Sequence, residues 1–297
     1  MKSAVASDHS LSPDIASSRH TSLLWEAYLL TCLLPAVFLW DLVNHFLAMI
    51  VRDETYSHIP IVPVVSAFFI FYEKETFLSG PGSGWKWAIA FAGIVSLVLA
   101  RMNPWQWSPS IQMTPLAIGF VFVWAGAFGI FFGETALRAA SFALFFLLFA
   151  IPIPTPLLSE TIALLLKGSA EAVSLLFHIF NVPAIRQGFD FALPGVTIRV
   201  AEECSGIRST LALVMAAVLA GHLWLRSFPR TFILCLATIP ISIVKNALRI
   251  AVLSWLAIHI DAQFLLGSVH HEYGGILFFS FGLLQMVGVL MLLRRFR

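Results

Sequence analysis

Three side chains in separate segments of the chain have the chemistry that acyl transfer requires. Cys204 stands in AEECSGIRST, Arg249 in IPISIVKNALRIAVLSWLAIHI, and His271 in DAQFLLGSVHHEYGG. A thiolate attacks a carbonyl carbon, a guanidinium stabilises the oxyanion that forms, and an imidazole carries the proton. These residue types therefore indicate a nucleophilic reaction with a covalent intermediate on sulfur.

Cys204 precedes the apolar run that begins at Ile207, so we expect its thiol at the end of a membrane helix. A sulfur at the positive end of a helix, with Arg208 one turn further on, is shifted towards the thiolate. The alternative is a buried cysteine that acts as a small apolar side chain. Cys32 and Cys235 lie within apolar runs, and the three cysteines show no metal-ligand spacing. The sequence therefore predicts neither a disulfide framework nor a metal site.

Arg249 follows Lys245 by four residues within an apolar run, with Asn246 between them. Charged residues inside a membrane span are costly and usually face a cavity or a partner. At about 1.5 Å per residue from Arg230, Arg249 lies roughly 28 Å along the helix, close to one membrane boundary. The alternative is an Arg249 side chain that extends to the lipid head groups.

His270 and His271 come directly before the last apolar run, at the same membrane face as Cys204 and Arg249. Histidine is the usual proton carrier near neutral pH. The alternative for either residue is a solvated polar side chain in a loop. A Cys, an Arg and a His that converge on one face favour an enzyme over three separate coincidences.

The composition places these segments in a membrane. The chain has 297 residues, of which 59% are hydrophobic and 11% charged, whereas soluble domains are about one quarter charged. Its net charge is +2 and its basic residues are scattered, so we expect lipids and no nucleic acid as partners. Runs of about 20 apolar residues predict spans at 24–46, 58–73, 85–101, 114–133, 136–153, 206–225, 230–259 and 273–293.

Basic residues in the short loops gather on the side that carries both termini, which predicts cytoplasmic termini. Residues 1–22 are then a cytoplasmic tail, residues 23–293 a single multi-pass membrane domain, and residues 294–297 a basic cytoplasmic end. An insert at about 154–205 lies on the opposite side of the membrane.

The insert begins with a segment whose polar residues recur at helical spacing. They are Glu160, Lys167, Glu171, Ser174 and His178. We expect an amphipathic helix on the membrane surface or over a polar cavity. Pro194-Gly195 and the alternation of residues 196–200 then predict a small β-hairpin before Cys204. The predicted fold class is an all-α polytopic membrane protein of about eight spans with these two extracytoplasmic elements.

The motifs resemble those of the exosortases and archaeosortases over about residues 25–293. The resemblance rests on AEECSGIRS, KNALRI and HHEYGG, in that order, with TYSHIPIVP at 55–63 and IPIP at 151–154. It implies Cys204 as nucleophile, Arg249 as the oxyanion stabiliser, and as acid and base a histidine four residues before a glycine. Both His270 and His271 meet that condition. We choose His271, because Gly275 leads directly into the apolar ILFF run.

The resemblance also indicates supporting residues, and it has two departures. Arg208, Asn246 and His58 lie within the matching motifs, as does Glu203, which stands where a small residue commonly precedes the Cys. Ile59 stands where the family often has a Gly after Tyr-Ser-His. These departures concern the subfamily more than the reaction.

The resemblance implies proteolytic sorting of secreted proteins. The substrates would carry a C-terminal signal composed of a PEP-like motif, a hydrophobic helix and a basic tail. They would be cut at the periplasmic face of a bacterial inner membrane and passed to an acceptor of unknown identity, in connection with exopolysaccharide or biofilm export. No cofactor and no metal are implied.

Two other classes of protein fit the composition. A transporter would line its cavity with Lys245, Arg249, Asp41 and the polar stripe of the insert, although no internal repeat is apparent. A scaffold subunit of a polysaccharide export system would leave the three polar residues without a chemical role.

Overall fold

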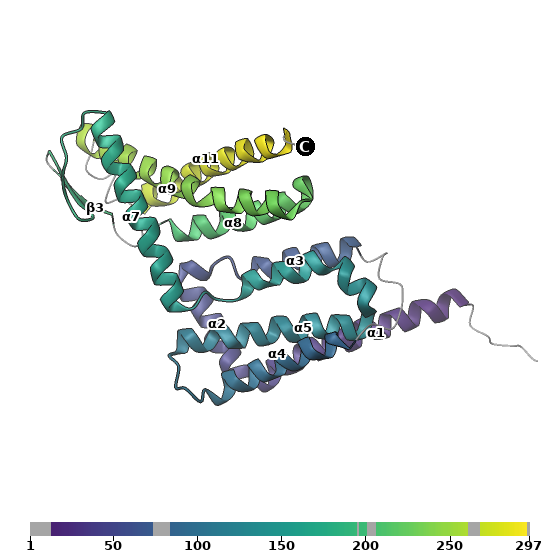
Figure 1. Ribbon diagram of the computed structural model, residues 1–297. Helices are drawn as coiled ribbons and strands as arrows, with labels where there is room; N and C mark the ends of the chain where they lie inside the picture. Colours follow the sequence, from purple (N-terminus) through teal and green to yellow (C-terminus); the bar gives the residue numbers. More distant parts are fainter. Residues whose placement is uncertain (1–12, 74–83, 195, 201–205, 261–267, 296–297) are drawn as a thin grey trace, which may run out of the picture. The chain divides into compact units, whose positions relative to one another are not determined.

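The chain folds into helices that form two compact units. The computed structural model describes residues 13–73, 84–194, 196–200, 206–260 and 268–295 (Figure 1). Unit one comprises Met1–Met49 and Ile59–Pro152, and unit two comprises Ile50–His58 and Ile153–Arg297. Each unit has its own apolar core.

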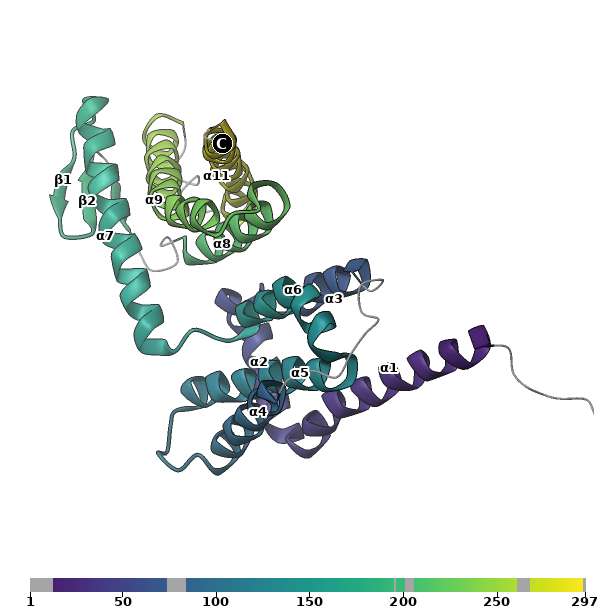
Figure 2. The ribbon, with the colours of Figure 1, turned by 45° about the vertical axis from the view of Figure 1, so that its right-hand side comes forward.

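In its described residues, unit one has helices joined by turns and loops, and no strand. Its elements are α1 (Pro13–Phe38), α2 (Trp40–Arg52, whose last three residues belong to unit two), α3 (Ile61–Glu73), α4 (Trp85–Met102), α5 (Pro109–Ala139), α6 (Ser141–Phe146) and the 3₁₀ helix η3 (Leu147–Ala150). Helices α4 and α5 lie side by side in both ribbon views (Figures 1 and 2). They can approach closely because Gly126 of α5 has no side chain. A Cβ atom at that position would lie only 2.5 Å from the backbone nitrogen of Ala90 in α4.

Two of the predicted spans in unit one differ from the observed helices. The region 24–46 contains the end of α1 and the start of α2, which are bent by 89° at Leu39. The prediction of a span at 136–153 is wrong, because the apolar helix there runs only from Ser141 to Ala150, about half the length that crosses a bilayer. The hydropathy of this region is high, but the backbone breaks at Gly133 within α5, the part of α5 after that break ends at Ala139, and Pro152 and Pro154 follow Ala150 directly.

The membrane character of the chain is confirmed. Among the described residues, seven helices are long and apolar enough to cross a membrane, or eight if the bent pair α1 and α2 counts as one span. Large apolar side chains such as Phe91, Trp224 and Phe228 are exposed, as expected for surfaces that face lipid. The chain is therefore a multi-pass membrane protein that contacts lipids, with about the predicted number of spans.

The described residues of unit two form four helices, one π-helical turn, a three-stranded sheet and a segment from earlier in the chain. Its elements are η1 (Glu54–Tyr56), α7 (Thr155–Ile179), β1 (Ile185–Gln187), β2 (Asp190–Leu193), β3 (Val196–Arg199), α8 (Ile207–Ala220), the π-helical turn η5 (Gly221–Leu225), α9 (Phe228–His259) and α11 (Ser268–Arg295). Helices α8, α9 and α11 lie side by side (Figures 1 and 2). Leu213, Leu234 and Met286 form their shared core, one residue from each helix.

Helix α7 has the polar stripe that the sequence predicts. Glu160, Lys167, Glu171 and His178 are exposed, whereas Leu166, Val173 and Phe177 on the other side are buried. The buried side packs against the sheet and α9. At 25 residues α7 is itself long and apolar enough to cross a membrane, a possibility that its polar stripe did not suggest.

The predicted hairpin is confirmed and has a third strand. Strand β2 pairs antiparallel with β3, with Leu193 opposite Val196, and β1 pairs antiparallel with β2. Ile198 and Val200 are buried while Thr197 and Arg199 are exposed, as the alternation predicts. Gly195, the second residue of the predicted turn, lies outside the described residues.

Candidate functional site

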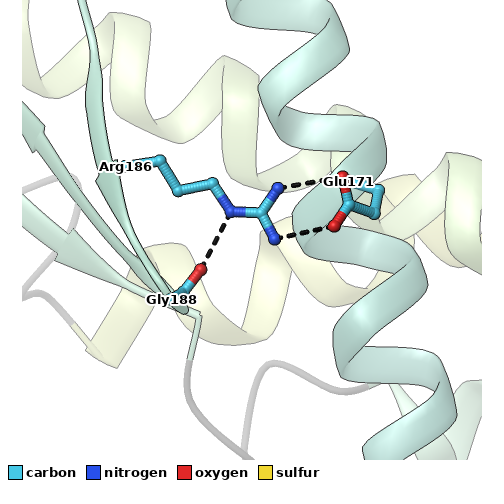
Figure 3. A network of polar contacts seen from close by, with 3 residues as sticks. All are labelled: Glu171, Arg186 and Gly188. Carbon is cyan, nitrogen blue, oxygen red and sulfur yellow. Dashed lines mark hydrogen bonds and ion pairs between the residues drawn. The ribbon is translucent and has the colours of Figure 1, made fainter.

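The sheet that precedes residue 204 is fixed to α7 by an arginine. Arg186 of β1 donates from both terminal nitrogens to Glu171 of α7, at 3.0 and 2.9 Å, and from Nε to the carbonyl oxygen of Gly188 at 2.9 Å (Figure 3). Such a bidentate pair defines both distance and orientation. The Glu171 carboxylate holds the pKa of Arg186 above its usual value. The sheet that precedes Cys204 in the chain is thus attached to α7 through its first strand, β1.

The segment resumes at the N-terminus of α8, where Gly206 has a left-handed backbone with φ 72°. This conformation favours glycine because a side chain would be strained there. The carbonyl oxygen of Gly206 accepts hydrogen bonds from the hydroxyls of Ser209 and Thr210, at 2.8 and 2.9 Å. Cys204 and Glu203 lie outside the described residues, so the structure describes the turn that follows the cysteine but not the thiol.

Helix α9 presents three polar residues to this turn and to α7. Lys245 is buried and donates a hydrogen bond from Nζ to the Ser209 hydroxyl. Asn246 is buried too, and its Nδ2 donates to the Ser169 hydroxyl of α7 at 3.0 Å. Arg249 is partly exposed, one turn further along the helix. The two buried residues hold α9 against its neighbours, and Arg249 remains accessible.

A cavity of about 620 Å³ lies between these elements. Its lining comes from η1, α7, α8, α9 and α11. Among the lining residues are Gly206 and Ser209 at the start of α8, Lys245 and Arg249 of α9, and Gly275 and Phe278 of α11. The lining is therefore mixed, since apolar side chains alternate with three cations, three hydroxyls and the carboxylate of Glu54. Polar groups that converge in a partly apolar cavity are typical of a ligand pocket.

The segment around His58 contributes the rim of this cavity. Glu54 and Thr55 line it, and the Glu54 carboxylate forms an ion pair with Arg208 of α8. Nδ1 of His58 lies 3.1 Å from the Thr55 carbonyl oxygen, so that nitrogen is the donor. His58 thus supports the rim segment, and Arg208 joins that segment to α8.

The remaining predicted residues, His270 and His271, lie in the first turn of α11. Their side chains are outside the described part of the structure. Within the described part, no group of three His, Cys, Asp or Glu side chains is arranged to hold a metal ion.

The structure thus brings together Arg249, Arg208, Asn246 and His58 around one cavity or directly beside it. Sequence reasoning missed Ser209 and Glu54, which are the partners of Lys245 and Arg208. Both stand in or next to the motifs that carry the resemblance, but a single hydroxyl or carboxylate has no pattern that would distinguish it.

The comparison with protein families covers all of these elements. The family model described as Transmembrane exosortase (Exosortase_EpsH) matches residues 50–288, from the end of α2 into α11. Among curated proteins and among solved structures, none matches the chain. The family match includes every motif on which the resemblance rests, and the chain therefore belongs to the transmembrane exosortase family.

Proposed function

We propose that this chain is a cysteine protease and transpeptidase that removes C-terminal sorting signals from secreted proteins. Membership of the exosortase family supports an enzyme that processes sorting signals in general. The observation that carries the specific proposal is the cavity of unit two. Its lining includes Arg249, Gly206 two residues after Cys204, and Gly275 four residues after His271. Three distant motifs thus meet at one cavity.

The proposed reaction begins with attack of the Cys204 thiolate on the carbonyl carbon of the scissile peptide bond. The oxyanion that forms accepts hydrogen bonds from the Arg249 guanidinium. As the C–N bond breaks, His271 gives its proton to the leaving amine and a thioester with Cys204 remains. His271 then takes a proton from water or from an acceptor amine, which attacks the thioester; the C–S bond breaks, the product leaves, and the Cys204 thiolate and protonated His271 are restored.

The register of α11 supports His271 over His270 as the acid and base. His271 precedes Gly275 by four residues and Phe278 by seven, and both of these line the cavity. Residues at such spacings share one face of a helix. His270 precedes Leu277 by seven residues, and Leu277 is 68% exposed and does not line the cavity.

The ion pair between Arg208 and Glu54 supports an anchoring role for Arg208. Arg208 also lines the cavity, but its charge already has a carboxylate partner. An arginine so engaged is better suited to anchor the rim than to meet a charge that forms only in the transition state. We therefore assign Arg208, with Asn246, His58 and Glu203, to support of the site.

The proposed substrates are secreted proteins that end in a short PEP-like motif, a hydrophobic helix and a basic tail. Their helix would hold them in the bacterial inner membrane while the motif reaches the periplasmic face. A link to exopolysaccharide export is part of the proposal. For the transporter alternative, Asp41 pairs with Arg101 at 3.6 Å within unit one, and Lys245 and Arg249 line the cavity within unit two.

The proposal is tested with a secreted reporter that ends in a C-terminal tail of this type taken from the same genome. Co-expression with the wild-type chain should shorten the reporter, and mass spectrometry should locate the new C-terminus before the hydrophobic helix. A reporter that keeps its full length with every such tail would contradict the proposed function.

The same assay separates the two histidines. His271→Ala should abolish processing, and His270→Ala should leave a substantial part of it, because only position 271 shares a helix face with the cavity lining. Membrane abundance of both variants, measured by immunoblot, serves as the control. The reverse pattern of activity would move the acid and base role to His270.

The proposed orientation has its own test. Single cysteines near residue 80 and at the C-terminus should be shielded from an impermeant thiol reagent in intact cells, and one near residue 190 should react. This follows from the basic residues in the short loops, which favour the cytoplasmic side. Labelling of the C-terminal cysteine would overturn the orientation and place the cavity on the cytoplasmic side.

A further inference from the structure

Lys245 is an unusual residue for the middle of a membrane helix. It is 4% exposed, although it lies in α9 among apolar neighbours. Burial of an ammonium group is costly unless hydrogen bonds compensate. Among the described residues, its hydrogen-bond partner is the Ser209 hydroxyl, across from it at the start of α8. The proposed reaction gives neither residue a role.

The bond from Lys245 to Ser209 is the first of two in series. An ammonium group only donates hydrogen bonds, so the Ser209 oxygen is the acceptor. The Ser209 hydroxyl hydrogen is then directed to the carbonyl oxygen of Gly206, 2.8 Å away. Bonds in such a series polarise and strengthen one another. The charge of Lys245 thus acts on the residue two positions after Cys204.

Packing fixes Lys245 and the turn in place. A Cβ atom added to Gly282 of α11 would lie 3.2 Å from Cδ of Lys245, so the lysine stem fills the space beside that glycine. Asn246, the next residue, lies beside Gly206, since a Cβ atom added there would be 3.6 Å from the Asn246 Oδ1. Two consecutive residues of α9 therefore contact the turn through Ser209 and through Gly206.

We propose that Lys245 is a positioning residue of the reaction. Through Ser209 it holds the Gly206 carbonyl and so sets the direction in which the chain before α8 presents Cys204. Lys245 acts through these two residues and does not touch the substrate. The inference rests on the proposed function, because it requires Cys204 to be the nucleophile.

The test uses the purified full-length chain in detergent and a peptide that spans the cleavage site of the reporter. Lys245→Met keeps the length of the side chain and removes its donors, and Ser209→Ala removes the relay. Each should lower kcat about tenfold to a hundredfold, the cost of a small misplacement of reacting groups, and leave KM within about twofold. Ser209→Thr, which keeps the hydroxyl, should retain most of the wild-type kcat.

A double variant shows whether the two residues act in one series. Lys245→Met with Ser209→Ala should lose no more activity than the more damaged single variant, because residues in one network are not additive. Ser159→Ala is the matched control, since Ser159 makes the same hydroxyl-to-carbonyl bond to the third residue before it, Pro156, at 2.8 Å on the exposed start of α7. This control should keep the wild-type kcat.

Three results would overturn the inference. The first is an unchanged kcat in Ser209→Ala. The second is a raised KM with unchanged kcat in Lys245→Met, which would make Lys245 a substrate-binding residue. The third is a loss of kcat in the double variant that equals the product of the two single losses. Ser209→Ala and Ser209→Thr keep the test decisive if Lys245→Met does not fold. Activity in Cys204→Ala would instead refute the proposed function, so the two failures are distinguishable.

Discussion

Cys204→Ala should abolish processing of the reporter while the protein stays in the membrane at its wild-type level. Loss of the nucleophile removes the covalent route altogether, and by analogy with serine proteases the rate should fall on the order of 10⁶-fold. The readout is the ratio of full-length to shortened reporter, with membrane abundance measured on the same samples. The reactivity of the Cys204 sulfur provides a second readout. A substrate-derived electrophile should add to Cys204 in the wild type and form no adduct at this position in Cys204→Ala.

Cys235→Ala is the matched control for this variant. Cys235 lies on α9, half-buried beside the apolar core of α8, α9 and α11, so its loss removes a thiol from the same unit without affecting the cavity. Its processing should remain near that of the wild type. Full processing of the reporter by Cys204→Ala, or an adduct on another residue, would contradict the proposed mechanism. The chain would then have to be considered again as a transporter or a scaffold subunit.

Arg249→Lys should be severely impaired although it keeps the positive charge. A guanidinium donates two parallel hydrogen bonds in a fixed plane, whereas an ammonium presents a single centre on a flexible stem. Loss of one oxyanion donor in other enzymes lowers the rate on the order of 10² to 10³, or about 2.7–4 kcal/mol. We expect a loss of that size in kcat with the peptide substrate.

Arg208→Lys is the comparison that gives this result its meaning. Lysine can keep an ion pair with Glu54, and the rim should stay attached to α8, so acylation should slow much less than in Arg249→Lys. Adduct formation with the substrate-derived electrophile, followed by mass spectrometry, measures both variants under one condition. Normal processing by Arg249→Lys together with failure of Arg208→Lys would transfer the oxyanion role to Arg208.

Much of the membrane architecture could be predicted because hydropathy and residue alternation are local properties. The long apolar runs gave α4, α5, α8, α9 and α11, and the alternation after Pro194 gave β3. The region 136–153 could not be predicted in the same way. A hydropathy average counts apolar residues but does not register where a backbone changes direction, as it does at Gly133, where φ is 86° and ψ is 177° within α5.

Some residues of the candidate site could be predicted from the sequence, and their partners could not. Arg249 could be identified because a charge within an apolar helix stands out against its neighbours. The partner of Arg208 could not, because Glu54 lies in a distant segment and only the fold brings the two together. The same holds for Ser209, whose importance depends on Lys245 rather than on its own sequence context. Isolated charges are visible in a sequence, whereas their counterparts become visible only in three dimensions.

The segment Ile50–His58 belongs to unit two although unit one surrounds it in the chain. The ribosome therefore makes Glu54 early and Arg208, to which it is joined, only after all the helices of unit one. The cavity receives its last wall when α11 emerges at the end of synthesis. A chain divided after Pro152 would leave Glu54 on the fragment that lacks the rest of the cavity. The rim is thus synthesised well before the residues that it joins, and a division of the gene after Pro152 would place the residues of one cavity on two polypeptides.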